Sequence, residues 1–261
     1  MGILNVTPDS FSDDGAYFDP EKAIAHGKQL EQDGADIIDI GGESTRPGSE
    51  AVSEEEELRR VMPVVAALAP VLRIPISIDT YRSGVARRAL EAGAQIVNDI
   101  SGFRFDESLP SVIRDARAAI VLMHSRGDRQ NLHKQTKMTD PLKEIVDTLN
   151  ESVGMARTAG IPDASIVIDP GVGFGKTASE SLLVLKSLSE FSKLPYPLLV
   201  GTSRKSFIRF VSEEPESHLW GTAASVAIAI MNGAHIVRVH DVRAMRIVSD
   251  VADAILCLPS S

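Results

Sequence analysis

Polar and charged side chains recur at the ends of short apolar runs in this chain, and they fall into two chemical groups. The first group offers donors suited to phosphate or pyrophosphate: Asn5, Ser44, Thr45, Arg46, Arg238 and His240. The second group mixes fixed acceptors and donors: Asp79, Asn98, Asp169 and Lys205. A carboxylate can accept two parallel N–H bonds, so this second group suits a flat heterocycle with amino and ring N–H groups. Together these residues indicate an N-heterocycle that carries a phosphorylated leaving group.

Several of these residues also have a purely structural interpretation, which the sequence leaves open. Asp79 and Asp169 could cap helices or form a structural ion pair with Lys205. Asp39 and Asp99 adjoin the candidate site, where such residues often only orient their neighbours. His124 could be a hydrogen-bonded histidine of the core.

The elements that position these residues show a regular alternation. Short β-branched runs alternate with longer segments of helical period, which is the pattern of repeated βα units. Eight runs are expected to form strands: residues 2–6, 36–40, 74–79, 95–100, 119–123, 165–169, 197–201 and 235–239. Between them, Asp19 and Pro20 predict a helix start, and Ser53 with Glu56 predicts a capping box. Helix C-caps are expected at glycines that shortly precede strands: Gly34, Gly93, Gly160 and Gly233.

The number of repeats predicts the fold. Eight βα units in about 250 residues are the size of a single (β/α)8 barrel, whose active site lies at the C-terminal ends of the strands. No linker divides the chain, so we expect one α/β TIM-barrel domain over residues 1–261. A doubly wound open sheet is the alternative. Because the chain begins at the first strand, we also expect that a short N-terminal segment closing the barrel floor is absent or trimmed.

Composition excludes several classes of partner. The formal net charge is -9 and the pI is about 5.2, which argues against a surface that holds nucleic acid or anionic lipid. Cys257 is the only cysteine in the sequence, so an intramolecular disulfide is impossible and a reducing, cytoplasmic setting is expected. No apolar run reaches membrane-spanning length.

Three other features are interpreted as structural. Residues 171–177 (GVGFGKT) are similar to a phosphate-binding P-loop, but Pro170 stands where the first glycine is required. We interpret this segment as a flexible loop whose Phe174 can flank a planar ligand. The acidic run 54–57 is expected to be a solvated helix start. Trp220 and Met231 are interpreted as packing residues.

Long motifs in a fixed order carry a resemblance to a known family. They are residues 5–13 (NVTPDSFSD), 41–48 (GGESTRPG), 78–80 (IDT), 98–102 (NDISG), 169–177 (DPGVGFGKT), 203–206 (SRKS) and 238–241 (RVHD). With these motifs the chain strongly resembles the dihydropteroate synthases of folate biosynthesis. The loop after the fifth run departs from the family pattern, because residues 125–129 lack a nearby proline.

The resemblance implies a transferase that condenses 6-hydroxymethyl-7,8-dihydropterin pyrophosphate with p-aminobenzoate by an SN1-type substitution. Catalysis would rest on Asp79, Lys205, Arg238 and Asp169. The pterin would be held by Asp79, Asn98, Asp169, Lys205, Met123, Phe174 and Gly201. Pyrophosphate would be bound by Asn5, Thr45, Arg46, Arg238 and His240, with Mg2+ near Asn5 and Asp13 assisting. The aminobenzoate pocket would be shaped by Phe11, Thr45, Pro47, Phe174, Lys205 and Ser206.

The resemblance also implies a homodimer and a sulfonamide target. The nearest rival enzyme is a methyltransferase that moves a methyl group from methyltetrahydrofolate to a corrinoid on a similar barrel. That enzyme needs neither the 44–48 segment nor the anion-binding pair Arg238 and His240, and both are present here. A non-catalytic pterin-binding paralogue is the other alternative, although it could have lost Asp79 or Lys205 without penalty.

Overall fold

Eight parallel strands form the centre of the computed structural model, which describes residues 1–7, 19–44, 52–128, 131–132 and 136–258. The strands are β1 (Gly2–Asn5), β2 (Ile38–Gly41), β3 (Ile76–Asp79), β4 (Ile96–Asp99), β5 (Ala119–Met123), β6 (Ile166–Asp169), β7 (Leu199–Gly201) and β8 (Ile236–Arg238). Both ends of each strand lie within about two residues of the run expected from the sequence, because buried parallel strands read as continuous apolar runs.

The strands close into the predicted barrel. β1 to β6 pair in sequence order, and β7 pairs with β8. Isolated bridges join the two sheets at both seams, between Ile168 and Leu198 and between Gly2 and Val239. At the second seam the Ile3 N–H donates to the Val239 carbonyl at 3.0 Å, and the Ile168 N–H donates to the Pro197 carbonyl at 3.0 Å at the first. The open doubly wound sheet is therefore wrong for this chain.

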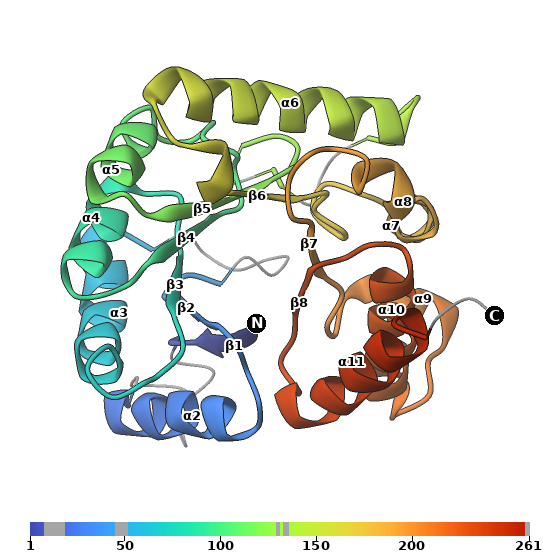
Figure 1. The fold of residues 1–261 in the computed structure, drawn as a ribbon, viewed down its shortest axis with the longest axis horizontal. Helices are drawn as coiled ribbons and strands as arrows, with labels where there is room; N and C mark the ends of the chain where they lie inside the picture. Colours follow the sequence, from blue (N-terminus) through green and yellow to red (C-terminus); the bar gives the residue numbers. More distant parts are fainter. Residues whose placement is uncertain (8–18, 45–51, 129–130, 133–135, 259–261) are drawn as a thin grey trace.

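Helices form an outer ring around the barrel (Figure 1). They are α2 (Pro20–Gln32), α3 (Glu54–Leu68), α4 (Ser83–Glu91), α5 (Leu109–Ala116), α6 (Pro141–Ala159), α7 (Ala178–Lys186), α8 (Leu188–Phe191), α9 (Ser206–Val211), α10 (Ser217–Met231) and α11 (Val242–Leu256), with a 3-10 turn η1 (Asp163–Ser165). The main core lies between this ring and the strands. Within the described ranges, no helix combines the length and the apolar character needed to cross a membrane.

The helix ends follow the predicted signals with one exception. Asp19 Oδ1 accepts backbone N–H groups of the first turn of α2, and Gly160 ends α6 with φ 90°. Ser53 Oγ accepts the Glu56 N–H at 3.2 Å. The Glu56 carboxylate, however, binds Arg59 at 2.7 Å. The predicted capping box is therefore only half formed, because a charged donor within reach outcompetes the backbone N–H.

The outer face of α10 corrects one expectation. Trp220 is 63% exposed and Met231 is 47% exposed, so neither packs in the core of the chain. The interpretation of both as packing residues is wrong within a single chain. Because α10 is apolar on nearly all sides, its sequence does not show which side turns toward the barrel.

The barrel interior has an apolar floor beneath a polar upper layer. The floor is formed by Met1, Val121 and Leu199 together with Ile37, Ile96, Val167 and Ile236. Further along the strands, the positions in register are Asn5, Gly41, Asp79 and Asn98. Neighbours in register on parallel strands project to the same side. The fold therefore places these residues at one edge of the barrel, above a packed floor.

Candidate active site

Arg238 lies at the centre of the candidate site and joins two carboxylates. Its Nε donates to Asp39 Oδ2 at 2.6 Å, and its Nη2 donates to Asp79 Oδ2 at 2.6 Å. Asn98 Nδ2 donates to the same Asp39 oxygen at 3.0 Å. The Asp39 side chain is fully buried, whereas those of Asp79 and Arg238 are 17% and 20% exposed. One cation thus pairs with two carboxylates. Arg238, predicted to bind pyrophosphate, is in direct contact with Asp79, predicted to bind the heterocycle.

The carboxyl of Asp79 has an unusual proton affinity. Burial raises its pKa from 3.8 to about 7; Arg238 opposes this rise, and the negative charge of Asp39 adds to it. Asp39 Oδ1 is buried and has no hydrogen-bond partner among the described residues. The same holds for Oγ of Ser77, which is in register with Asp39. A carboxyl group whose pKa lies near 7 shifts toward its ionised form when positive charge develops beside it.

Asp169 and Lys205 form the second set of opposite charges. Burial raises the pKa of Asp169 and lowers that of Lys205 to about 8, and each residue opposes the shift of the other. Lys205 Nζ donates to the Val172 carbonyl and lies 4.4 Å from the centroid of the Phe174 ring. Asp169 Oδ1 accepts the Gly171 N–H at 2.7 Å. Asp169 therefore caps its own loop rather than a helix, and this loop supplies both contacts of the lysine.

Apolar groups lie beside these charges. Met123 ends β5 in register with Asp169 and shares an apolar cluster with Phe174. The same cluster contains Ile100, Leu132, Tyr81 and Phe105. Gly201 is in register with Arg238, and a Cβ at this glycine would lie 3.8 Å from Lys205 Nζ. The predicted residues Met123, Phe174 and Gly201 thus lie around the charged groups, where a flat ring would meet apolar surface beside carboxylates.

His240 and its neighbours connect the loops after β7 and β8. His240 Nδ1 lies 2.9 Å from Ser203 Oγ, and the His240 N–H donates to the same oxygen at 3.2 Å. Arg204 has a φ of 57°, and its guanidinium binds Asp241 Oδ1 at 2.6 Å. Ser206 follows as the first residue of α9. These bonds fix the backbone that directly precedes Lys205 relative to the end of β8.

Two residues left open by the sequence have structural partners. Asp99 Oδ1 accepts the Ser101 N–H at 2.7 Å, and Oδ2 accepts the Phe103 N–H at 2.6 Å, so Asp99 orients the loop after β4. His124 is buried, with its Nδ1 2.7 Å from Lys176 Nζ. Burial, followed by the charge of Lys176, lowers the pKa of His124 to about 2. His124 is thus a neutral histidine of the core. Its partner, Lys176, belongs to the 169–177 motif but was given no role in the sequence analysis.

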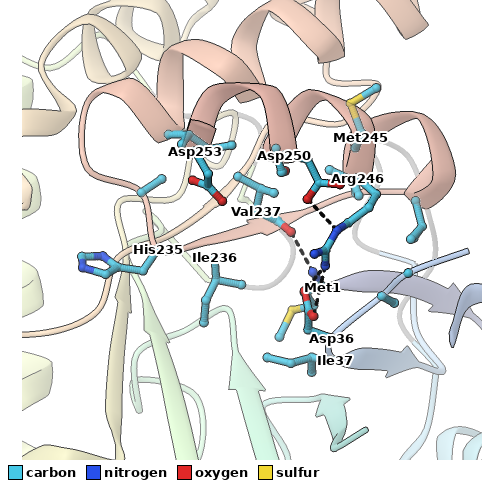
Figure 2. Close-up of a pocket in the computed structure, with 17 residues that line it drawn as sticks. Met1, Asp36, Ile37, His235, Ile236, Val237, Met245, Arg246, Asp250 and Asp253 are labelled. Atoms are coloured by element: carbon cyan, nitrogen blue, oxygen red, sulfur yellow. Dashed lines mark hydrogen bonds and ion pairs between the residues drawn. The ribbon is translucent and has the colours of Figure 1, made fainter. Parts of the chain in front are cut away.

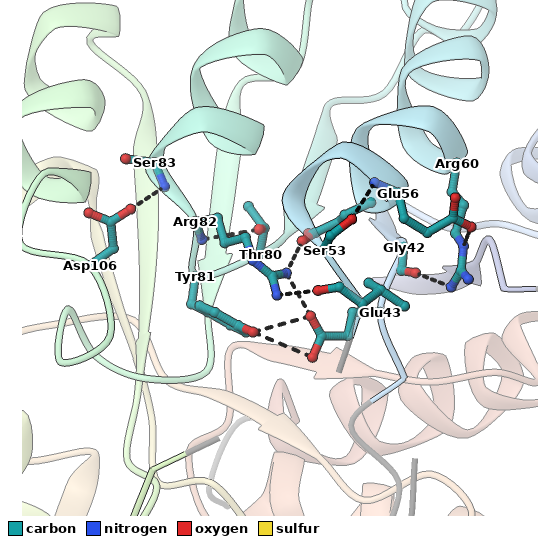
Figure 3. Close-up of polar contacts among 12 residues, drawn as sticks. Gly42, Glu43, Ser53, Glu56, Arg60, Thr80, Tyr81, Arg82, Ser83 and Asp106 are labelled. Atoms are coloured by element: carbon teal, nitrogen blue, oxygen red, sulfur yellow. Dashed lines mark hydrogen bonds and ion pairs between the residues drawn. The ribbon is translucent and has the colours of Figure 1, made fainter. Parts of the chain in front are cut away.

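Arg82 binds residues that precede and follow positions 45–51 in the sequence (Figure 3). It donates to Glu43 Oε2 at 2.6 Å, to the Val52 carbonyl at 2.7 Å and to the carboxylate of Glu57. Glu57 is 1% exposed, so the expected solvated helix start is wrong at this residue: α3 turns this carboxylate inward to Arg82. The sequence held no signal for this contact, because Glu43 and Glu57 lie 39 and 25 positions away.

Some predicted site residues lie outside the described part of the chain: Phe11, Asp13, Thr45, Arg46 and Pro47. Asn5 is described; it is half-buried at the end of β1. Among the described residues, no three or more His, Cys, Asp or Glu side chains gather as a metal site would require. The Asn5 amide oxygen nevertheless suits Mg2+, which commonly takes one or two protein oxygens and completes its shell with water and phosphate.

Comparisons with known proteins agree with this geometry. The sequence model of the pterin binding enzyme family matches residues 1–240. Dihydropteroate synthases of Synechocystis sp. and Bacillus subtilis are 49% and 48% identical over 257 residues, 98% of this chain and 89% and 88% of theirs. The structure is similar to Xanthomonas albilineans dihydropteroate synthase with 4-aminobenzoic acid (TM-score 0.92, 41% identity, 99% of this chain and 93% of that one). It is also similar to that organism's enzyme in complex with 7,8-dihydropteroate (TM-score 0.89, 39% identity, 99% and 94% covered).

Proposed function

The chain belongs to the pterin-binding enzymes and, within them, to the dihydropteroate synthases, and from this membership we propose how its site works. The reaction joins 6-hydroxymethyl-7,8-dihydropterin pyrophosphate to p-aminobenzoate and yields 7,8-dihydropteroate and pyrophosphate. The observation that carries the proposal is the position of Arg238 between Asp39 and Asp79 at the C-terminal end of the barrel. There it can contact the leaving group while the carboxylates beside it contact the pterin.

The chemical problem in this proposal is charge separation. In an SN1-type substitution the C–O bond breaks before the amine attacks, so positive charge develops on the pterin and negative charge on pyrophosphate. Each charge needs groups that are already oriented toward it. The amine of p-aminobenzoate is the nucleophile, so no side-chain nucleophile is required. Water must be kept from the cation, which would otherwise be hydrolysed.

The pterin end of the site consists of Asp79, Asn98, Asp169 and Lys205, with Met123, Phe174 and Gly201 lining it. We assign Asp79 the main catalytic role. Because its pKa is about 7, the carboxyl is only partly ionised at neutral pH, and a positive charge on the ring beside it would favour the fully ionised form. Asp169 would accept pterin N–H groups, and Lys205, whose pKa is lowered to about 8, would donate to a pterin acceptor.

The pyrophosphate end combines described and undescribed residues. Arg238 and His240 would bind the leaving group from β8 and the loop after it, and Asn5 would do so from β1. Thr45 and Arg46, outside the described residues, would add donors. Mg2+ would be held by Asn5, and when bound it supplies positive charge that stabilises the departing pyrophosphate.

The aminobenzoate pocket would lie beside Lys205. Phe174 offers an aromatic face 4.4 Å from the Lys205 ammonium, and Ser206 follows in the chain. Phe11, Thr45 and Pro47 would complete the pocket from segments outside the described residues. The attacking amine would then lie on the side of the pterin that carries the leaving group.

The proposed function is tested by following pyrophosphate release and dihydropteroate formation with Mg2+, in the presence and absence of p-aminobenzoate. We expect dihydropteroate only when both substrates are present. Pterin binding without product would contradict the proposal and favour the non-catalytic paralogue. Methyl transfer from methyltetrahydrofolate to a corrinoid, with no dihydropteroate, would favour the rival methyltransferase.

We also propose that the chain forms a homodimer through the outer faces of α7, α9 and α10. A groove of about 620 Å³ there is lined by apolar side chains, including Leu182, Val211 and Trp220. Val211 and Trp220 are 67% and 63% exposed, and a chain that stays monomeric rarely shows such a patch. The proposed setting is the cytoplasm, which suits the exposed free thiol of Cys257.

The homodimer is tested by light scattering after size exclusion. Wild-type protein is expected at twice 28.1 kDa. Trp220→Glu places a charge on the proposed interface and is expected to give monomers. Val71→Glu is the matched control, because Val71 is 51% exposed and lies away from the groove. A wild-type monomer, or a dimer unaffected by Trp220→Glu, would contradict the proposed interface.

A further inference from the structure

Backbone carbonyls of the loop after β6 converge on the ammonium of Lys176. Lys176 Nζ donates to the carbonyl oxygens of Gly171 at 2.9 Å and of Phe174 at 3.2 Å. The same nitrogen lies 2.7 Å from His124 Nδ1 and 3.5 Å from the His124 carbonyl oxygen. Its partners therefore come from two loops, those after β5 and β6, and none of them is a carboxylate.

The backbone of this loop explains why its carbonyls converge. Gly171, Gly173 and Gly175 have φ of 67°, 82° and 62°, conformations that L side chains rarely adopt. A Cβ at Gly171 would lie 1.9 Å from the His124 carbonyl oxygen, so the two loops pack backbone against backbone. Carbonyl dipoles directed at one point repel each other unless a cation lies between them. The Lys176 ammonium supplies that cation.

The same loop also contacts two residues of the proposed site, Asp169 and Lys205. The Val172 carbonyl accepts Lys205 Nζ, and the Phe174 ring lies 4.4 Å from that nitrogen. The Gly171 N–H donates to Asp169. Two of the residues whose carbonyls Lys176 binds therefore also contact the site: Gly171 contacts Asp169, and Phe174 contacts Lys205.

We propose that Lys176 is a positioning residue: its ammonium holds the loop after β6 in the conformation that presents Phe174 and the Val172 carbonyl to Lys205. Lys176 contacts no reacting group and acts through this loop. Phe174 and Lys205 border both the pterin and the proposed aminobenzoate pocket, but the pterin also keeps Asp79 and Asn98, which lie on β3 and β4. Lys176 therefore affects the binding of aminobenzoate more than that of the pterin. This last step rests on the proposed function.

The charges around Lys176 are consistent with this role. Burial lowers its pKa to about 7; Asp169, Glu144 and Glu180 oppose the shift, and Lys205 adds to it. His124, held neutral, can accept a hydrogen bond from the ammonium through Nδ1. The carbonyl oxygens and the neutral imidazole face this nitrogen where burial disfavours its charge, and below pH 7 the ammonium form predominates.

The proposal is tested by NMR of protein with ¹³C-labelled lysine, without any substrate. The ε-protons of Lys205 lie near the Phe174 ring, so their signal is expected upfield, and Lys205→Met assigns it. Lys176→Met is expected to remove this ring-current shift. Lys193→Met is the matched control, because Lys193 is a lysine 68% exposed, paired only with Glu190 in the contacts described, and is expected to leave the shift intact. A folded Lys176→Met protein that keeps the full shift would overturn the proposal.

Kinetics then tests the consequence for the reaction. In Lys176→Met the KM for p-aminobenzoate is expected to rise by on the order of tenfold, because misplaced binding groups cost about this much or more. The KM for the pterin substrate is expected to change far less. Equal changes in both constants would indicate general damage and would contradict the positioning role.

A second variant covers the case in which Lys176→Met does not fold. Lys176→Gln keeps N–H donors without the charge, and it is expected to give an intermediate ring-current shift and an intermediate KM. A folded Lys176→Gln protein with both values equal to wild type would overturn the role of the ammonium. If wild-type protein makes no dihydropteroate, the proposed function fails, while the NMR result still decides whether Lys176 positions the loop.

Discussion

Two arginines at opposite ends of the barrel each bind two aspartates, and the two triads differ in burial. At the C-terminal end, Arg238 binds Asp39 and Asp79, each at 2.6 Å. None of these three side chains is more than 20% exposed. The charges cannot be solvated by bulk water, so they act strongly on each other and on anything that enters between them.

At the floor, Arg246 binds Asp36 at 3.3 Å and Asp250 at 2.9 Å, beside a pocket of about 430 Å³ (Figure 2). Here the arginine is 45% exposed and the aspartates are 80% and 58% exposed. Water and salt screen such pairs, and they contribute little. Residue type alone therefore does not make a reactive cluster: one arginine with two aspartates interacts strongly only where the strands bury all three side chains.

The largest effect is expected from Arg238→Met, which removes the shared cation of the buried triad. Turnover should fall by on the order of a thousandfold, because a charged donor to the leaving group is lost. The free energy of unfolding should fall by about 3 kcal/mol, because Asp39 and Asp79 are left without their counterion. Steady-state assays and urea unfolding measure the two losses. A variant with near wild-type turnover would show that the triad is only structural.

An intermediate effect is expected in the pH dependence of stability. The pKa of Asp79 is about 7 in the folded protein and near 3.8 when unfolded, so between these values the folded state binds more protons. The wild-type free energy of unfolding should therefore fall, relative to that of Asp79→Asn, as pH rises from 4 to 7. The change should be on the order of 2–4 kcal/mol, at about 1.4 kcal/mol for each unit of pKa shift. Urea unfolding of both proteins at several pH values measures it, and a constant difference would be inconsistent with the raised pKa.

The smallest effect is expected from Arg246→Met, the counterpart of Arg238→Met at the floor. Its exposed pairs should contribute less than about 1 kcal/mol to stability, and dihydropteroate formation should be unchanged. The same unfolding and activity assays apply. A loss of activity comparable to that of Arg238→Met would remove the distinction between the two ends of the barrel.

The fold was predictable because its signals are local. Apolar runs locate the strands, and Asp19 and Gly160 mark helix ends through their own backbone chemistry. Once the runs are known to be parallel strands of a barrel, the residues at their ends must converge. This is why Asp79 and Arg238 could be assigned to one site although 159 positions separate them.

The partners within the site could not be predicted in the same way. Asp39 was left open between a direct and an orienting role, because only the folded barrel shows that Arg238 and Asn98 both bind it. Lys176 lies in a motif that resembles a phosphate-binding loop, yet its ammonium binds backbone carbonyls of that same loop. Such contacts depend on packing between distant segments, which has no period in the sequence.

The role of Asp79 is decided by measuring turnover and pterin affinity in the same preparation of Asp79→Asn. If Asp79 stabilises the positive charge that develops in the transition state, turnover should fall by on the order of a hundredfold or more. The affinity for a pterin ligand, measured by calorimetry, should weaken far less. Equal losses of affinity and turnover would contradict this catalytic role and show that Asp79 only binds the pterin.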